Sequence, residues 1–508
     1  MDSLQWLIAG FETAFQWHNL AFAFFGVLIG TAVGVLPGIG PVSGVALLIP
    51  ITTSITASLS PTEAATSAII MLAGVYYGAM YGGSTTSILL NTPGEAASVV
   101  TTLDGYQMAK KGRAGAALSI AAIGSFVAGI FALIGLIILA KPLSKLAINF
   151  GPAEYASLMV LGLCAVSGLS GKSMTKALLM TVLGLLVGTI GIDSVSGIAR
   201  FTFNQPSLFE GIEFLTVAVG LFALGEVYKS IIEKDYVHGK VAKINSILPN
   251  KEEIKDSVPA IFRGSIIGFI IGVLPGAGAS IASFFSYSAE KKVSKTPEKF
   301  GTGMIQGVAG PESANNAASG GAMIPLLTLG IPGSGTTAIL MGALIMYNVQ
   351  PGPLLFDKHP DVAWGLIASM FIGNVILLIL NMPMIKVFAK VIETPPKYLL
   401  PLIIAISVFG VYAVRLTLFD LILLVICGVL GYVFTKFDYP VAPFVLALVL
   451  GTMLEYNMRR ALTISDGSYS IFLKEPLSAV FLLAAALWIF VPIILKMRGK
   501  KVIVNEEG

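Results

Sequence analysis

The sequence predicts an all-α polytopic membrane protein made of two inverted-topology repeats that carry paired Pro/Gly-broken helical hairpins. The 508-residue chain is 55% hydrophobic and 12% charged, whereas soluble domains carry about 25% charged residues. Many apolar stretches reach the roughly 20 residues that a helix needs to cross a bilayer. In addition, the segment Gly34–Gly40 (GVLPGIG) recurs about 238 residues later as Gly272–Gly278 (GVLPGAG). These observations indicate a duplicated membrane architecture.

A second sequence signature recurs at nearly the same spacing. Gly82–Gly83 precedes Thr92–Gly94 in the first half, and Gly320–Gly321 precedes Ile331–Gly333 in the second. Pro and Gly interrupt helices, and paired interruptions at corresponding places of two halves are typical of a transporter's binding site. Glycines also serve close helix packing alone, but the recurrence of the Pro-Gly pairs favours a functional role.

The distribution of Lys and Arg predicts the orientation of the chain, because basic residues collect in cytoplasmic loops. The four basic clusters lie at 110–113, 229–255, 291–299 and 496–501. The stretch before His18 contains neither Lys nor Arg. We therefore expect a periplasmic N-terminus and a cytoplasmic C-terminus. Arg459-Arg460 falls on the outer side and is the weakest point of this scheme.

The number of crossings predicts the inverted topology. We expect about 11 crossings in all, of which five precede the basic loop, so the second half begins on the opposite face. These five lie near 63–81, 117–140, 153–172, 177–195 and 211–228. The resulting division is 1–228 (first repeat), 229–262 (cytoplasmic linker loop), 263–458 (second repeat) and 459–508 (C-terminal transmembrane helix and basic tail).

Four further apolar segments are expected to enter and leave the membrane on one side, as re-entrant hairpins. Their tips leave backbone N–H and C=O groups unpaired, which is tolerated only beside a cavity or a bound ion. The hairpins cover 20–56, 82–108, 263–290 and 320–350. The breaks of the first and third hairpins are Pro37, Gly38, Gly40, Pro275, Gly276 and Gly278. The tips of the other two, meeting near the midplane, would line one cavity.

Polar side chains gather at these two tips. Helix N-termini at Pro93 or Ser334 would direct free N–H groups at an anionic solute. Neither tip contains Lys or Arg, so we expect a co-transported cation to balance the charge, and oxygen atoms near Asn91 suit Na⁺. For each Ser or Thr, a hydrogen bond to the carbonyl four residues back is the structural alternative. The candidate substrate- and ion-binding residues are Ser84, Thr85, Thr86, Asn91, Thr92, Pro93, Gly94, Asn315, Asn316, Pro332, Gly333, Ser334, Gly335, Thr336 and Thr337.

One acidic residue stands in an apolar span just before the second tip. Glu312 begins the polar run 312–316, and an ionisable residue at membrane depth indicates function by default. A position near the outer interface, or a salt bridge, is the alternative interpretation.

Three long runs carry a family resemblance. Gly34–Ile49, Tyr76–Leu118 (with GGSTTSILLNTPGEAASVVTTLDGYQMAKKGRAGAAL) and Gly310–Gly335 resemble the large membrane subunit of the tripartite tricarboxylate transporters. The resemblance covers nearly the whole chain. It implies a bacterial inner-membrane importer of carboxylates, with citrate or a related tricarboxylate as the leading candidate, coupled to a cation gradient and elevator-like. It also implies two protein partners, a small four-helix membrane subunit and a periplasmic solute-binding protein. A homodimer is a further candidate assembly.

Other classes of protein remain as alternatives. A stand-alone secondary anion transporter or channel would use the same scaffold without a binding protein. An enzyme is disfavoured, because His18, His238 and His359 all fall at interfaces or in loops and no His-Glu-x-x-His motif exists. No phosphate loop for ATP is present. The net charge of +4 is spread over short loops and therefore indicates topology rather than nucleic-acid binding. Besides the coupling ion we expect no cofactor.

Overall fold

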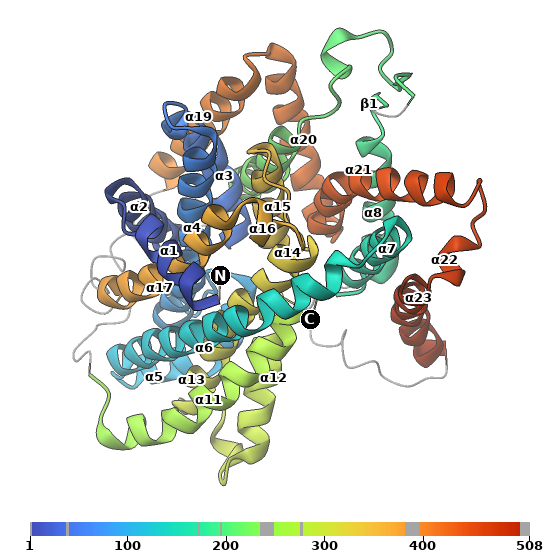
Figure 1. Cartoon of the computed structure of the whole chain (residues 1–508). Coiled ribbons are helices and arrows are strands. Elements are labelled where there is room, and N and C mark those ends of the chain that lie inside the picture. Colours follow the sequence, from blue (N-terminus) through green and yellow to red (C-terminus); the bar gives the residue numbers. More distant parts are fainter. Residues whose placement is uncertain are drawn as a thin grey trace.

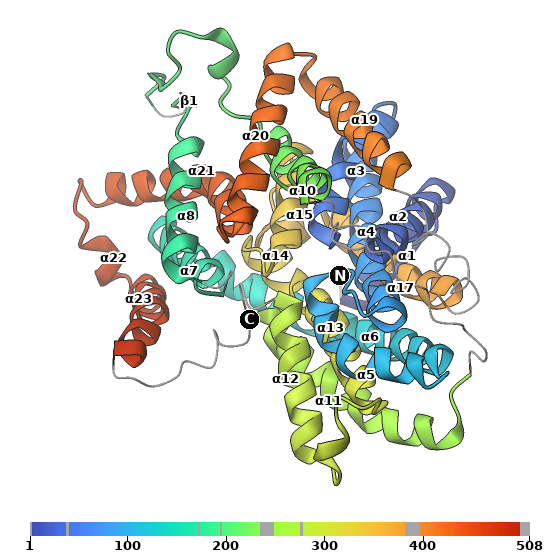
Figure 2. The same ribbon diagram turned by 180° about the vertical axis from the view of Figure 1, so that it is seen from behind.

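The computed structural model describes residues 3–36, 40–169, 173–193, 196–233, 248–274, 278–381 and 396–497, and Figure 1 and Figure 2 show it from opposite sides. Within these ranges, eight helices are long and apolar enough to cross a membrane. The predicted class, a helical multi-pass membrane protein, is thereby confirmed. The predicted breaks Pro37, Gly38, Pro275 and Gly276 lie outside the described residues.

The first half of the chain begins with a short helix and two helices separated by the first break. Helix α6 then runs across the molecule (Figure 1). The helices are α1 (Ser3–Ala14), α2 (Trp17–Val35), α3 (Gly40–Thr56), α4 (Pro61–Leu90), η1 (Ala96–Ser98), α5 (Val99–Lys110), α6 (Ala114–Ile148), α7 (Pro152–Leu169), α8 (Met174–Gly188), η2 (Pro206–Leu208), α9 (Phe214–Ala218), η3 (Val219–Leu224) and α10 (Gly225–Glu233).

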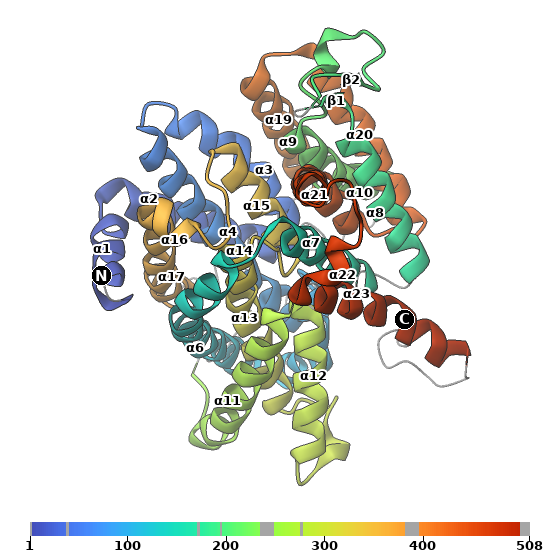
Figure 3. The same ribbon diagram turned by 45° about the vertical axis from the view of Figure 1, so that its right-hand side comes forward.

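The second half places α11 and α12 side by side at one end of the molecule (Figure 2). Its last helices, α21 to α23, pack with α7 and α8 on one flank (Figure 3). The helices are α11 (Lys251–Val273), α12 (Gly278–Val293), η4 (Pro297–Lys299), α13 (Gln306–Gly321), α14 (Met323–Leu329), α15 (Gly335–Met346), α16 (Leu355–Lys358), α17 (Pro360–Asn381), α19 (Pro396–Arg415), α20 (Leu418–Lys436), α21 (Val441–Ile464), α22 (Ile471–Lys474) and α23 (Pro476–Met497).

The same glycine-lined helix contact occurs once in each half. Three glycines of α2, four residues apart, face carbonyl oxygens of α4, and three glycines of α11 face carbonyl oxygens of α13 in the same way. The distance from each glycine's would-be Cβ to the facing oxygen is 2.1–2.4 Å, so no side chain fits and the backbones touch. The pairs are Gly26–Met71, Gly30–Val75, Gly34–Ala79, Gly264–Gly310, Gly268–Ala314 and Gly272–Ala318.

The two halves differ at the helix that leads into each tip. Gly82 and Gly83 lie within the continuous 30-residue helix α4, so the crossing expected at 63–81 and the first arm of the hairpin form one helix. The corresponding segment of the second half breaks at Ala322 between α13 and α14. Pro325 explains the break, because it cannot donate a hydrogen bond to the carbonyl of Gly321 and its ring crowds that carbonyl.

Helix α11 begins earlier than the sequence analysis expected. It starts at Lys251, inside the range 229–262 that was assigned to a loop. The side chain of Asn250 accepts a hydrogen bond from Glu253 N (2.8 Å), and the carboxylate of Glu253 accepts one from Asn250 N (2.7 Å). This reciprocal capping box fixes the start of the helix. At 23 residues α11 is long enough to span the bilayer, as is α2.

The segment after α8 is also different from the expectation of a purely helical chain. The crossing expected at 177–195 ends at Gly188, and two short strands follow, β1 (Gly191–Ile192) and β2 (Ala199–Arg200), which pair antiparallel. Beyond them, α9, η3 and α10 form one apolar stretch, Phe214–Glu233, whose middle part is a π-helix.

Candidate functional site

In the first half, the hairpin tip lies directly against the end of the broken helix pair. A Cβ on Gly94 would stand 2.1 Å from the carbonyl oxygen of Gly34 and 2.7 Å from Cα of Gly83. Gly94 N also donates to the carbonyl oxygen of Gly83 (3.4 Å). The two Gly/Pro signatures of the first half, at 34–40 and 82–94, therefore contact one another.

The second half repeats this arrangement. A Cβ on Gly333 would stand 2.9 Å from Cβ of Ala322 and 3.3 Å from the carbonyl oxygen of Gly272. The helical arm before each tip ends in a left-handed residue, Asn91 (φ 56°) and Gly330 (φ 70°). After each break, the new helix starts with a left-handed glycine, Gly40 (φ 61°) or Gly278 (φ 67°).

The polar residues of the first arm mostly satisfy local carbonyl groups. The Ser84 hydroxyl donates to Tyr81 O (2.8 Å) and the Thr86 hydroxyl to Gly83 O (3.3 Å). Both carbonyl groups lie three residues back, one residue closer than in the structural alternative considered from the sequence. Asn91 is exposed at the tip, and Thr92 and Pro93 beside it are half-buried. Thr85 is buried, at 4% exposure. Among the candidate residues of the first hairpin, Asn91 is therefore the most accessible to a ligand.

The polar residues of the second tip divide in the same manner. Ser334 caps α15 by accepting from Thr337 N (3.3 Å), and the Thr337 hydroxyl in turn accepts from Ser334 N (2.8 Å). These two side chains therefore hold the turn. Thr336 lies between them in the chain and is 3% exposed. A Cβ on Gly335 would stand 3.3 Å from Cβ of Ala442 in α21 and 3.6 Å from Cγ2 of Val42 in α3. The second tip thus reaches the broken helix pair of the first half.

Two residues that the sequence analysis did not select lie between the tips. The Tyr76 side chain is buried near Ser319, Ser334 and Glu95. Glu95 follows Gly94 directly, and its buried Oε1 has no hydrogen-bond partner among the described residues. Glu95 could have been predicted as a site residue, because it is an acidic residue directly after Pro-Gly in an apolar hairpin. Tyr76 could not, because it stands in a run of mostly apolar residues.

Glu312 lies at the centre of a buried polar network rather than at an interface. Its side chain is 0% exposed and accepts hydrogen bonds from the Thr101 hydroxyl of α5 and from Asn315 Nδ2 (3.2 Å). Asn316 Nδ2 donates to Ser125 Oγ of α6 (2.7 Å). The network therefore joins α13 to the second arm of the first hairpin and to α6.

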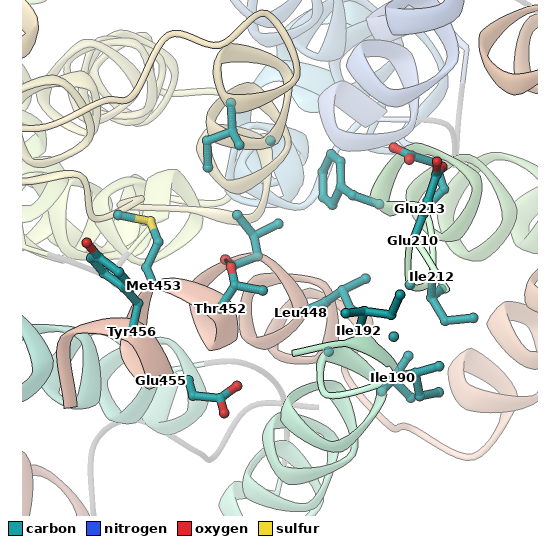
Figure 4. A pocket seen from close by; sticks show the side chains of 18 of the residues that line it. Ile190, Ile192, Glu210, Ile212, Glu213, Leu448, Thr452, Met453, Glu455 and Tyr456 are labelled. Carbon is teal, nitrogen blue, oxygen red and sulfur yellow. Dashed lines mark hydrogen bonds between the residues drawn. The ribbon is translucent and has the colours of Figure 1, made fainter. Parts of the chain in front are cut away.

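A separate cavity of about 800 Å³ opens at the far end of α15. Figure 4 shows Leu448, Thr452, Met453 and Tyr456 along α21, opposite Glu210 and Glu213. Beside this cavity Arg459 pairs with Asp193 (2.8 Å) and Glu455 (2.6 Å), and Arg200 pairs with the same two acids (3.4 and 2.6 Å). The charge of Arg459 is thus neutralised by neighbouring acids. A periplasmic position of Arg459 is therefore easier to reconcile with the predicted topology.

Together, these features define a polytopic membrane protein in which each hairpin tip lies against the end of the helix before a break. Residues 20–446 match the model of the Tripartite tricarboxylate transporter TctA family. The chain belongs to this family, which confirms the resemblance and makes it a membrane component of a tricarboxylate transporter. Members of this family are the large subunit of a tripartite system, so membership implies partners in the membrane and the periplasm.

Two relatives from Agrobacterium vitis match the chain. One, described as "Uncharacterized 52.8 kDa protein in TAR-I ttuC' 3'region", is 45% identical over 509 residues and covers 100% of both chains. The other, "Uncharacterized protein in TAR-II ttuC' 3'region", is 43% identical over 234 residues, 46% of this chain and 97% of its own. No solved structure matches the chain.

Proposed function

We propose that this protein is the transporting subunit of a secondary active importer for di- and tricarboxylates in a bacterial inner membrane. It works with a small four-helix membrane subunit and receives its substrate from a periplasmic solute-binding protein. An inward Na⁺ gradient drives uptake, and the part that carries the tips moves in an elevator-like manner. The N-terminus is periplasmic and the C-terminus cytoplasmic. The two halves have inverted topology, because an odd number of crossings precedes the second half.

The observation that carries this proposal is the pairing of a tip with a helix break in each half. A tip that ends a helix exposes backbone groups, which need a cavity or a ligand at membrane depth. The N-terminal end of α15 at Ser334 supplies free N–H groups and the positive end of a helix dipole. A carboxylate suits such an end, and family membership supports that substrate class.

Reconstituted uptake tests the proposal. The purified chain and its small membrane subunit are placed in proteoliposomes, the binding protein is added outside, and labelled citrate and C4 dicarboxylates are offered with an inward Na⁺ or choline gradient. We expect uptake only with the binding protein and the Na⁺ gradient. Asn91→Ala should reduce uptake, whereas Asn204→Ala, at another exposed asparagine with a left-handed backbone (φ 59°), should not.

Other results would point elsewhere. Uptake of equal rate without the binding protein would favour the stand-alone anion transporter or channel. Uptake that is insensitive to the Na⁺ gradient but follows a pH gradient would replace Na⁺ by protons. Failure of every carboxylate, with a transporter that is folded by its size-exclusion profile, would reject the substrate class.

A further inference from the structure

The hydrogen bonds around Glu312 are those of an ionised carboxylate. The Thr101 hydroxyl donates to Oε1 and Asn315 Nδ2 donates to Oε2. Asn315 Nδ2 can only donate and the Thr101 hydroxyl is able to donate, so both bonds are satisfied when the carboxyl group is ionised. The network therefore favours a negative charge on a side chain that is 0% exposed.

This charge has no positive partner among the described residues. No Lys, Arg or His in these ranges acts on Glu312, whose neighbours are Thr101 and Asn315. The other carboxyl group near Glu312 is that of Glu95, which supplies no positive charge. An unpaired buried charge costs several kcal/mol, and buried charges are therefore paired or bind a metal ion.

A second feature of the network points to a bound cation. Asn316 is 1% exposed, and its Oδ1 has no hydrogen-bond partner among the described residues. Its Nδ2 donates to Ser125 Oγ (2.7 Å), Asn315 Oδ1 (2.6 Å) and Glu312 O (3.0 Å). Three acceptors around Nδ2 fix the orientation of the amide, so Oδ1 is left as a buried acceptor that lacks a donor or a cation.

We propose that Glu312 is the anchor of a Na⁺ site, with Thr101 Oγ1, Asn315 Oδ1 and Asn316 Oδ1 as further ligands. Hard cations prefer oxygen ligands, and the bound charge would neutralise the carboxylate. This proposed site lies in the network of α13 with α5, a different place from the oxygen atoms near Asn91 that the sequence analysis favoured. The ion site itself does not depend on the proposed function. Only the role of this ion in driving uptake rests on it.

The arrangement also indicates how ion binding reaches the hairpin. Thr101 belongs to α5, the second arm of the first hairpin, whereas Glu312 and the two asparagines belong to α13. A cation held by ligands on both helices would hold the arm against α13. In its absence, the arm is attached at this point by the Thr101 hydrogen bond. Na⁺ would therefore strengthen the attachment of this arm to α13.

Sodium binding by the purified full-length chain in detergent tests the site without transport. The measurement is the thermal unfolding temperature, with ²²Na⁺ binding in parallel, as NaCl replaces choline chloride at constant ionic strength. We expect Na⁺ to stabilise the wild type. Thr101→Val and Asn316→Ala should each weaken Na⁺ binding about tenfold or more. Thr101→Ser keeps the ligand oxygen and should retain most of the affinity.

Glu312→Gln provides the decisive variant, because it should abolish Na⁺ binding and yet raise the unfolding temperature in choline by removing the unpaired charge. Glu298→Gln, an exposed acid in η4, is the control and should bind as the wild type. Wild-type protein that is stabilised by acid but not by Na⁺, or a Glu312→Gln variant that still binds Na⁺, would overturn the site. Sodium binding without Na⁺-driven uptake would leave the site standing and reject the coupling role.

Discussion

The carbonyl oxygen of Gly34 lies 2.1 Å from the place that a Cβ on Gly94 would occupy. This contact joins the end of α2 to the tip between α4 and η1, and its copy joins Gly272 to Gly333 at 3.3 Å. Because a real Cβ needs more space than 2.1 Å, residue 94 must be glycine for the tip to pack this closely against the break.

Gly94→Ala should therefore destabilise the protein and reduce uptake. The added methyl group meets backbone on one side and Gly83 on the other, and overpacking of this kind costs about 1–3 kcal/mol. The measurement is the unfolding temperature in detergent together with uptake in proteoliposomes. Gly373→Ala is the control, because its Cβ would meet only a Val27 methyl group at 3.5 Å. Equal effects of the two variants would argue against a tight tip.

Asp104→Asn should lower stability by about 3 kcal/mol or more, since each hydrogen bond to a charged group contributes about 1.5–3 kcal/mol. The buried Asp104 carboxylate accepts from three backbone N–H groups in loop 301–304 (2.7–3.0 Å) and from the Tyr287 hydroxyl (2.9 Å). These bonds attach α5 to the segment between η4 and α13. Chemical denaturation measures the loss.

Two further variants separate the contributions at Asp104. Tyr287→Phe removes a single hydrogen bond and should cost less than Asp104→Asn. Glu298→Gln alters an exposed acid of the neighbouring η4 and should change little. If Asp104→Asn were as stable as Glu298→Gln, the four contacts would not hold the hairpin arm in place.

Local signals in the sequence predicted several parts of the structure. The turns at Asn91 and Gly330 lie at the expected tips, because Asn and Gly adopt the left-handed backbone conformation more readily than other residues. The recurrence of Gly34 at Gly272 corresponds to equal glycine contacts in α2 and α11. Such features depend on a few neighbouring residues and on spacing, and both are visible in a sequence.

Contacts between distant segments could not be predicted. Thr101 and Glu312 are 211 residues apart, and no single-sequence pattern indicates that their side chains meet. The same holds for Tyr76 beside Ser334, and for Arg459 with Asp193, 266 residues apart. The break at Ala322 was not predicted, although Pro325 is a local signal for it.

Cysteine labelling tests the predicted inverted topology. After replacement of Cys164 and Cys427, a cysteine at Lys110 should react only with reagents that cross the membrane, and one at Lys358 with an impermeant maleimide from outside. Both lysines are exposed. Lys110 belongs to the basic cluster before α6, and Lys358 lies in the nearly cation-free segment before α17. Labelling of both from the same side would reject the inverted arrangement.

The two tips should bind one substrate, so that Asn91 and Thr336 act on the same affinity. Asn91→Gly removes the side chain while keeping the left-handed conformation (φ 56°), and Thr336→Val removes a hydroxyl at nearly constant volume. Citrate binding in detergent with Na⁺ is measured for both single variants and the double variant. We expect the double loss to differ from the sum by about 0.5 kcal/mol or more, since groups that share a ligand couple. Ser334→Ala is the control for helix capping and should lower stability by about 1 kcal/mol. Strictly additive losses would mean that the two tips belong to separate sites.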